Sequence, residues 1–379
     1  MPRKTNTTIN GSDYFRVTAT IGHNSDGRPL RKQFYGDSKK DAEAKRDAYL
    51  LNIHKGLSLN FDKATFGGAF KAWFENVLKP SISLSSYNRY KIDYRLRIKE
   101  SALSALKLTD VRAIHVQSYY NGLLESFSVN TVKQTHKLLK SFFIYCVKAD
   151  LIIKNPLLAV ELPHDDNADT VNTAISNNDV EKFLQAARND INQFIYVFAV
   201  FSGLRLGEIT ALTHKDINFK DNQIHVNKSM KYLVADGEYK PVVNRPKTDC
   251  SVRDVPILDE IQALLKAHIR YEKEKHFKLS IPFSEDCILF SSTICGYREG
   301  PNVRKALGRL CKRLDMNDTT FHSLRHTFCT ILARQGVSLK AASVLMGHSN
   351  ISITAKIYTK IDQDELKKEI QKLSVYFKK

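Results

Sequence analysis

One segment near the carboxyl end of the chain gathers side chains that could bind and act on an oxyanion. It reads Phe-His-Ser-Leu-Arg-His-Thr-Phe over residues 321–328. If these residues form a helix, His322, Arg325 and His326 are spaced i, i+3 and i+4 and share one face. That face presents a permanent positive charge between two imidazoles. Because a guanidinium binds phosphate or carboxylate through two parallel hydrogen bonds, the spacing favours an oxyanion site.

Two other interpretations of this face stay open at this point. His322, His326 and Cys329 have a plausible spacing for metal ligands. The fixed charge of Arg325 opposes a bound cation, however, and no fourth ligand is obvious nearby. The plainer interpretation is a solvated helix face with a single histidine in the core.

Residues further along the segment strengthen the oxyanion hypothesis. Residues 337–346 have the pattern of a short amphipathic helix, and Gly347 follows as a typical carboxyl-terminal cap. His348 comes directly after this glycine, and Tyr358 comes ten positions later. A tyrosine at a helix end usually packs in a core or an interface. Its place after two histidines and an arginine makes Tyr358 a candidate nucleophile.

Two upstream motifs supply further charged candidates. Arg205 interrupts a strongly apolar run that begins at residue 194, and a buried arginine must pair or bind an anion. Glu208 follows three residues later and is a possible partner. Lys247 belongs to an Arg-Pro-Lys-Thr-Asp sequence between two strand-like runs, residues 223–226 and 252–257. We expect Lys247 near a hairpin turn, where most lysines are simply solvated.

The order of these motifs resembles the tyrosine recombinase (phage integrase) family. Gly-Leu-Arg-x-Gly-Glu, Pro-Lys-Thr, His-x-Leu-Arg-His-Thr, Gly-His and a final tyrosine follow one another between residue 176 and about residue 360. The resemblance places six residues at the family's catalytic positions: Arg205, Lys247, His322, Arg325, His348 and Tyr358. Two positions differ slightly from common family patterns. Ser323 stands where the family often has aspartate, and Lys360 stands where a basic residue or histidine often follows the tyrosine.

The resemblance implies DNA strand cleavage through a 3′-phosphotyrosyl intermediate, followed by rejoining through a Holliday junction. A phenol has a pKa of about 10, so proton transfer must accompany its attack. No cofactor or metal is implied, because side chains compensate the charge. The implied roles are Tyr358 as nucleophile, Arg205 and Arg325 as phosphate clamp, Lys247 as general acid, His322 as base or proton relay, and His348 as phosphate donor.

The composition fits a protein that binds an extended polyanion. The chain has 379 residues and a net charge of +18, with lysine and arginine spread along its length. A hydrophobic content of 42% allows real cores and excludes disorder throughout. We expect no signal peptide and no membrane span. The six cysteines form no Cys-x-x-Cys pair, which is typical of reduced thiols in a bacterial cytoplasm, where the protein would associate with the nucleoid.

Residues 1–60 have the pattern of a strand pair followed by a helix. Residues 14–21 alternate, a turn follows, and residues 30–35 form the expected return strand. Ser38 and Asp41 resemble a capping box that opens a helix to residue 53. The module resembles the AP2-like domain of conjugative-transposon integrases, which binds arm sites in DNA through its sheet. Its DNA-binding candidates are Arg16, Arg31 and Lys32, and a purely structural cap is the alternative.

Residues 61–163 have the pattern of an all-helical domain that resembles the family's core-binding domain. Basic side chains recur on the expected outer faces of two of its helices: Arg89, Lys91, Arg95, Arg97, Lys99, Lys133, Lys137 and Lys140. The DNA-binding candidates among them are Arg89, Lys91, Arg95, Lys133 and Lys137. Residues 164–175 are the expected linker, and residues 176–379 the expected catalytic domain. The tail repeats apolar residues at positions 366, 370, 373 and 377, which is one helix stripe. We expect it to dock on a neighbouring subunit, with docking on its own domain as the alternative.

We therefore predict a multidomain protein that is mainly α with small antiparallel β-sheets. It would comprise a β-hairpin and helix module, a helical core-binding domain and a mixed α+β catalytic domain that acts in integration and excision. The predicted partners are double-stranded DNA attachment sites of core and arm type, further copies of the chain in a homotetramer, an excisionase and a host DNA-bending protein, but no membrane. Two rival functions are a type IB topoisomerase and a DNA-binding regulator without catalysis. The regulator would lack a motif residue, and none is missing.

Overall fold

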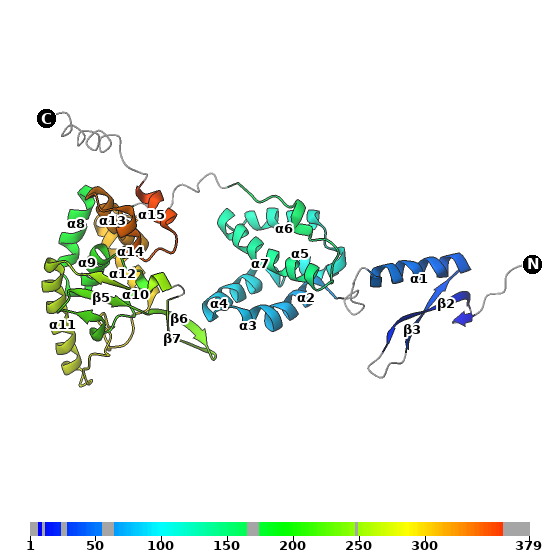
Figure 1. Cartoon of the computed structure of the whole chain (residues 1–379), viewed down its shortest axis with the longest axis horizontal. Coiled ribbons are helices and arrows are strands. Elements are labelled where there is room, and N and C mark those ends of the chain that lie inside the picture. The colour runs from blue at the N-terminus through cyan, green and yellow to red at the C-terminus, as the bar shows by residue number, and fades with distance from the viewer. Residues whose placement is uncertain are drawn as a thin grey trace, which may run out of the picture. The chain divides into compact units, whose positions relative to one another are not determined.

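The computed structural model of the chain describes residues 7–9, 12–23, 29–54, 64–164, 174–246 and 249–358. The chain divides into two compact units, Met1–Asp166 and Asn167–Lys379. Figure 1 shows the helices and strands of each. Helices predominate in the described residues, and the strands form small antiparallel sheets, as the sequence predicted. No helix among the described residues is long and apolar enough to cross a membrane.

The first module is a three-stranded antiparallel sheet with one helix packed on it. Its elements are β1 (Thr7–Ile9), β2 (Ser12–His23), β3 (Pro29–Gly36) and α1 (Lys39–His54). Val17 pairs with Phe34, which is buried and whose ring centre lies 5.0 Å from that of Tyr49 on α1. The amide of Asp41 donates to Ser38 Oγ at 3.1 Å, so Ser38 begins the helix. The predicted hairpin and helix are confirmed, and β1 is an additional strand.

A helical bundle follows from residue 64 to residue 164. Its α-helices are α2 (Phe66–Trp73), α3 (Lys79–Ser81), α4 (Leu84–Asp93), α5 (Ala102–Ala105), α6 (Ala113–Leu124) and α7 (Val129–Lys148). One π-helical turn follows α2 and another follows α4. The core is rich in aromatic rings, since Phe66, Phe70, Phe142 and Phe143 are all fully buried. Phe66 and Phe70, four residues apart on α2, both contact Phe142 on α7, and Phe66 also contacts Phe143.

The carboxyl-terminal unit packs helices around two small sheets. Its helices are α8 (Asn177–Arg188), α9 (Phe194–Ser202), α10 (Leu206–Ile209), α11 (Asp259–Lys278), α12 (Gly300–Arg313), α13 (Phe321–Arg334), α14 (Leu339–Met346) and α15 (Ile351–Tyr358). One sheet has the order β4 (Ile217–Asn218), β5 (Gln223–Val226) and β8 (Arg253–Pro256), and the other pairs β6 (Ser229–Ala235) with β7 (Glu238–Asn244). The sequence predicted the strands now labelled β5 and β8 but missed the hairpin between them.

Helix α9 forms the centre of this unit. All of its residues except Phe201 are buried, so it is apolar on every side, as expected of a core helix. It packs against α8, α11 and α13, and α13 in turn packs against α14 and α15. Segments that lie more than one hundred residues apart in the sequence therefore meet beside the carboxyl-terminal end of α9.

Candidate active site

Arg205 lies at the start of α10 and is held by a carboxylate. Its Nη1 donates to Glu208 Oε1 at 2.8 Å, and its backbone amide donates to Glu208 Oε2 at 3.0 Å. Glu208 is buried, whereas the side chain of Arg205 keeps 41% of its surface exposed. Burial alone would raise the pKa of Glu208, but Arg253 and Arg205 beside it outweigh burial and lower that pKa. Glu208 therefore stays ionised and orients Arg205, as the sequence interpretation allowed.

Arg325 on α13 is the most deeply buried of the predicted catalytic residues that the structure describes, with 2% of its surface exposed. Its Nη1 donates to the carbonyl of Gly203 at 2.6 Å, and its Nη2 donates to the carbonyl of Met346. Burial and the neighbouring Arg205 lower the pKa of Arg325 to about 9, which leaves the guanidinium charged at neutral pH. Gly203 ends α9 in the left-handed conformation, and a Cβ there would lie 2.2 Å from the ring of Phe328. Only glycine permits this contact.

Three arginines converge on the last turn of α14. The carbonyls of three consecutive residues, Leu345, Met346 and Gly347, accept from Arg253, Arg325 and Arg205 respectively. The carboxyl end of a helix carries unpaired carbonyls and a partial negative charge, which stabilises nearby cations. The helix ends at Gly347 with φ of 61°, so the predicted cap is confirmed.

Two histidines, His322 and His348, complete what we call the polar cluster. Its other members are Arg205, Glu208, Arg253 and Arg325. His348 follows the glycine cap, and its Nδ1 lies 2.8 Å from Thr354 Oγ1 in a shared hydrogen bond. Burial, followed by Arg325 and Arg205, lowers the pKa of His348 to about 4. Partial burial, followed by the same two arginines, also lowers the pKa of His322. Both imidazoles are therefore neutral at pH 7, and a neutral imidazole can accept a proton.

Tyr358 is placed differently from the other predicted residues. Its hydroxyl donates to the carbonyl of Val337 at 3.1 Å, in the connection between α13 and α14. Its ring packs against the small apolar cluster that contains Cys329 and Met346. Burial and Cys329 raise the pKa of Tyr358. The structure thus places Arg205 and Arg325 close enough to His322 and His348 to lower the pKa of both imidazoles. The hydroxyl of Tyr358 is bonded to the backbone carbonyl of Val337.

Lys247 lies outside the described residues, between the end of β7 and the start of β8.

Ser323, the position that departs from the common aspartate, has a clear local function. Its hydroxyl accepts from the amide of Thr320 at 3.1 Å, and Thr320 Oγ1 accepts from the amide of Ser323 at 3.2 Å. This is a reciprocal cap at the start of α13.

Arg253 is the site residue that sequence reasoning missed. Its side chain is 4% exposed, and its Nη2 donates to Glu208 Oε2 at 3.1 Å. The signal was present in the alternation of β8, where Arg253 shares the buried face with Val255. A charged side chain on the buried face of a strand requires a partner.

The metal alternative for the face of α13 receives no support from the described residues, in which no group of three or more His, Cys, Asp or Glu side chains is suited to hold a metal ion. Cys329 is fully buried in the apolar cluster beside Tyr358. The rings of His322 and His326 instead meet edge to face, with their centres 4.6 Å apart.

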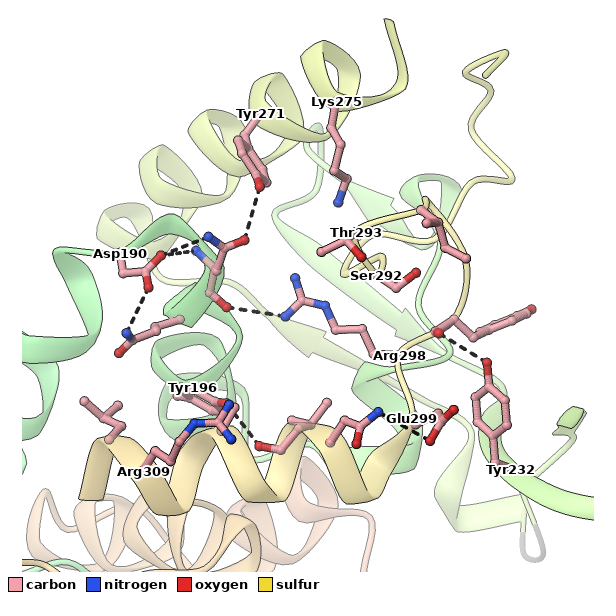
Figure 2. Close-up of a pocket in the computed structure, with 18 of the residues that line it drawn as sticks. Asp190, Tyr196, Tyr232, Tyr271, Lys275, Ser292, Thr293, Arg298, Glu299 and Arg309 are labelled. Carbon is pink, nitrogen blue, oxygen red and sulfur yellow. Dashed lines mark hydrogen bonds between the residues drawn. The ribbon is translucent and has the colours of Figure 1, made fainter. Parts of the chain in front are cut away.

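A separate cavity of about 810 Å³ lies in the same unit between α11, residues 292–299 and α12 (Figure 2). None of the predicted catalytic residues that the structure describes lines it. Figure 2 shows Arg298 reaching into it, below Tyr271 and Lys275. Two backbone carbonyls, those of Ser291 and Asn192, accept from Arg298 at 2.7 Å and 3.4 Å. The candidate active site is therefore not this cavity but the polar cluster at the end of α14.

The DNA-binding candidates of the first module lie on two faces of its sheet. Arg16 pairs with Tyr35 and Arg31 pairs with Thr20, on the face opposite α1. Lys32 lies on the face that α1 covers, and its Nζ is 3.9 Å from the ring centre of Tyr49. Arg16 and Arg31 therefore share an exposed face that Lys32 does not.

The helical bundle presents most of its candidates at the surface. Arg89, Lys91, Arg95 and Lys137 are exposed, and Lys133 is half-buried. Arg97, which the sequence also placed on the outer face of α4, instead forms a largely buried ion pair with Asp93. The expectation for Arg97 was wrong because a π-helical turn at Tyr94–Ile98 rotates the residues that follow α4.

Comparison with known proteins identifies two family models along the chain. The model of the phage integrase family matches residues 173–365, which include every described residue of the polar cluster. The model of the phage integrase N-terminal SAM-like domain matches residues 65–124, within the helical bundle.

Individual relatives extend the similarity to the whole chain. A tyrosine recombinase XerC-like protein of Caldanaerobacter subterraneus is 32% identical over 390 residues and covers 100% of both chains. The transposase from transposon Tn916 of Enterococcus faecalis is 25% identical and covers 89% of this chain and 82% of its own. Among solved structures, the Tn1549 transposon integrase in complex with a circular intermediate DNA has a TM-score of 0.70 at 23% identity, covering 82% of this chain and 100% of that one. The last similarity shows the fold.

Proposed function

The chain belongs to the phage integrase family, the tyrosine recombinases that cut and rejoin DNA strands, and we propose that it is the integrase of a phage or an integrative element. Integration and excision would both use its attachment sites. Similarity along the full length to a recombinase, and along most of it to a transposon transposase, supports this choice over a type IB topoisomerase or a non-catalytic regulator.

The observation that carries the proposal is the convergence of Arg205 and Arg325 on the carboxyl end of α14. Each guanidinium is fixed by backbone carbonyls, so each is oriented before a phosphate arrives. Donors that are oriented in advance stabilise the charge of a pentacoordinate phosphorus, and removing one such donor lowers a rate by about 10²–10³-fold. Two positive charges flanking one phosphate suit a DNA backbone better than a neutral ligand.

The remaining roles are those that the family resemblance implies for these residues. Tyr358 attacks phosphorus, His322 accepts or relays the phenol proton, and His348 donates to a phosphate oxygen. Lys247 protonates the leaving 5′-oxygen. For attack, the hydroxyl of Tyr358 must leave the carbonyl of Val337. The phosphotyrosyl bond preserves the energy of the broken phosphodiester, so the strand can be rejoined to another 5′-hydroxyl without a cofactor.

The proposed partners are DNA sites of two types. Residues 61–163 would bind core-type sites through Arg89, Lys91, Arg95, Lys133 and Lys137, and residues 1–60 would bind arm-type sites through Arg16, Arg31 and Lys32. Residues 164–175 link these domains to the catalytic domain, residues 176–379. Four copies would assemble on DNA through the tail that follows Tyr358, and this tail lies outside the described residues. An excisionase and a host DNA-bending protein would determine whether integration or excision occurs. The protein would act in the bacterial cytoplasm.

A nicked suicide substrate tests the proposal, because the strand fragment released after cleavage cannot rejoin. Wild-type protein should form a covalent protein–DNA adduct that denaturing gels detect, and Tyr358→Phe should bind the same DNA and form none. An adduct that survives Tyr358→Phe would contradict the nucleophile assignment. Exchange between two duplexes, followed by product length, separates a recombinase from a topoisomerase.

A further inference from the structure

Arg253 connects two parts of the candidate active site that the sequence separates widely. It begins β8, and its side chain is almost completely buried. Its Nη2 donates to Glu208 Oε2 at 3.1 Å, while its Nε donates to the carbonyl of Leu345 at 2.8 Å and its Nη1 to the carbonyl of Ser251 at 3.1 Å. All three nitrogens of the guanidinium are therefore engaged.

Glu208 is shared between two arginines. Its Oε1 accepts from Arg205 Nη1, and its Oε2 accepts from Arg253 and from the amide of Arg205. A carboxylate held by only one side-chain partner can rotate about its terminal torsion, which is broad and roughly two-fold. Arg205 contacts both oxygens of Glu208 by itself, but the two could move together. Arg253 is anchored on the carbonyls of Leu345 and Ser251, so its donor on Oε2 restrains Glu208 and with it the guanidinium of Arg205.

The contact with α14 acts on the other side of the cluster. Leu345 lies three residues before His348, and Gly347 in between has a left-handed backbone. A Cβ at position 347 would lie 2.8 Å from Arg253 Nη1 and 3.0 Å from its Cζ. The backbone at the end of α14 therefore packs directly on the guanidinium of Arg253, and the same turn supplies the carbonyl that Arg205 uses.

We propose that Arg253 is a positioning residue for the cleavage reaction, which holds Glu208 and the end of α14 so that Arg205 and His348 face the same phosphate. This inference rests on the proposed function. We place Arg253 behind Arg205 and not on the substrate, because its side chain is enclosed and all three of its guanidinium nitrogens, Nε included, already donate within the protein, whereas the hydrogen bonds of Arg325 use its Nη1 and Nη2. Its effect should therefore appear in the rate of the chemical step and not in DNA affinity.

Single-turnover cleavage of the nicked substrate at saturating DNA tests this role. Arg253→Met should lower the cleavage rate by about 100-fold, since a misplacement of about 1 Å can have an effect of that size. The DNA dissociation constant, measured by fluorescence anisotropy, should stay within about threefold of wild type. Arg253→Lys keeps the charge but cannot donate to Glu208 and to Leu345 together, so its rate should lie between those of Arg253→Met and wild type.

A double-mutant cycle separates positioning from a general loss of stability. Because Arg253 acts partly through Glu208, the two losses should not multiply. The double variant, with Arg253→Met and Glu208→Gln, should cleave at a rate within about threefold of the slower single variant. Lys228→Met is the control, since it removes a buried ion pair with Asp216 outside the cluster. It should lower the melting temperature and leave the saturating cleavage rate unchanged.

Three results would overturn the inference. One is a wild-type cleavage rate in Arg253→Met. Another is a double variant whose loss equals the product of the two single losses, and the third is a loss of rate in Lys228→Met as large as that in Arg253→Met. Failure of the wild-type protein to form any adduct would instead contradict the proposed function, so the two failures are distinguishable.

Discussion

Basic side chains are arranged in opposite ways in the two units of the molecule. At the end of α14, Arg205, Arg253 and Arg325 are fixed by backbone carbonyls, and the last two are buried. In the helical bundle, Arg95 and Lys137 are exposed. Buried guanidiniums tied to the backbone have a fixed position, whereas exposed ones supply charge without a fixed geometry. The first arrangement suits chemistry at one atom and the second suits attraction to a long polyanion.

The comparison predicts where substitutions affect rate and where they affect affinity. A buried donor should contribute to the transition state, and its loss cannot be compensated by salt or by protein concentration. An exposed cation should contribute a small amount to binding that weakens as salt rises. The predictions below test this division, from the largest expected effect to the smallest.

Arg325→Ala should lower the saturating cleavage rate by about 10²–10³-fold, because one oriented phosphate donor is lost. DNA affinity should change little, since the exposed basic faces remain. Single-turnover cleavage and anisotropy measure the two effects. Arg309→Ala is the control in the same unit, as this side chain lines the separate cavity of Figure 2. Equal loss of rate in both variants would remove the distinction between the cluster and the rest of the unit.

Gly203→Ala should destabilise the carboxyl-terminal unit by about 2–4 kcal/mol. The left-handed backbone disfavours a Cβ by about 1–2 kcal/mol, and the clash with the ring of Phe328 adds a similar amount. Denaturant unfolding followed by circular dichroism measures this loss. Gly308→Ala is the matched control, because a Cβ there meets nothing within 4 Å and α12 has ordinary helical geometry at that position. A smaller effect at position 203 than at position 308 would contradict the packing argument.

Acid should destabilise the carboxyl-terminal unit more than the helical bundle. Burial lowers the pKa of both His214 and His268 to about 4, below the ordinary value of 6.5. The stability linked to these neutral imidazoles is present above pH 6.5 and is lost as pH falls toward 4, by up to about 1.4 kcal/mol per pH unit for each.

The single tryptophan, Trp73, lies in the core of the bundle and reports on that unit alone. Between pH 7 and pH 5, the unfolding midpoint detected by circular dichroism should fall while the midpoint detected by Trp73 fluorescence moves less. A larger shift of the fluorescence midpoint would reverse the expected order of acid sensitivity.

Arg95→Ala and Lys137→Ala should each weaken DNA binding by about two- to fivefold at low salt and reduce the salt slope by about one unit. The cleavage rate at saturating DNA should not change. Arg97→Ala provides the contrast within the same bundle, because Arg97 pairs with Asp93. That variant should lower stability and keep the wild-type salt slope, and anisotropy titrations at several salt concentrations measure the slopes. An unchanged slope for both surface variants would argue that these cations do not contact phosphate.

The sequence predicted the elements that local patterns determine. The spacing of residues 321–328 predicted the helix face that carries His322 and Arg325, and the glycine after residue 346 predicted the end of α14. The alternation in residues 14–21 predicted the hairpin of the first module. Each of these depends on residues within one or two turns, so the linear pattern is sufficient.

The sequence did not predict features that depend on distant contacts. Arg253 joins the cluster only because β8 pairs with β5 and brings its buried face to Glu208 and α14. The convergence of three arginines on consecutive carbonyls has no linear signature at all. Lys32 lies on the face of the sheet that α1 covers, which depends on how the helix packs. The π-helical turn that places Arg97 inward has no simple signature in the sequence.

The hydrogen bond between Tyr358 and the carbonyl of Val337 sets the resting state of the enzyme. A bond between neutral groups contributes about 0.5–1.5 kcal/mol, so as far as this bond is concerned roughly one phenol in three to one in fourteen is already released at equilibrium. Free protein therefore keeps the proposed nucleophile on this carbonyl most of the time, yet a bound phosphodiester needs to supply only about 0.5–1.5 kcal/mol to break this bond. Substrate binding can supply a free energy of that size, so this bond by itself sets no requirement for a separate activator.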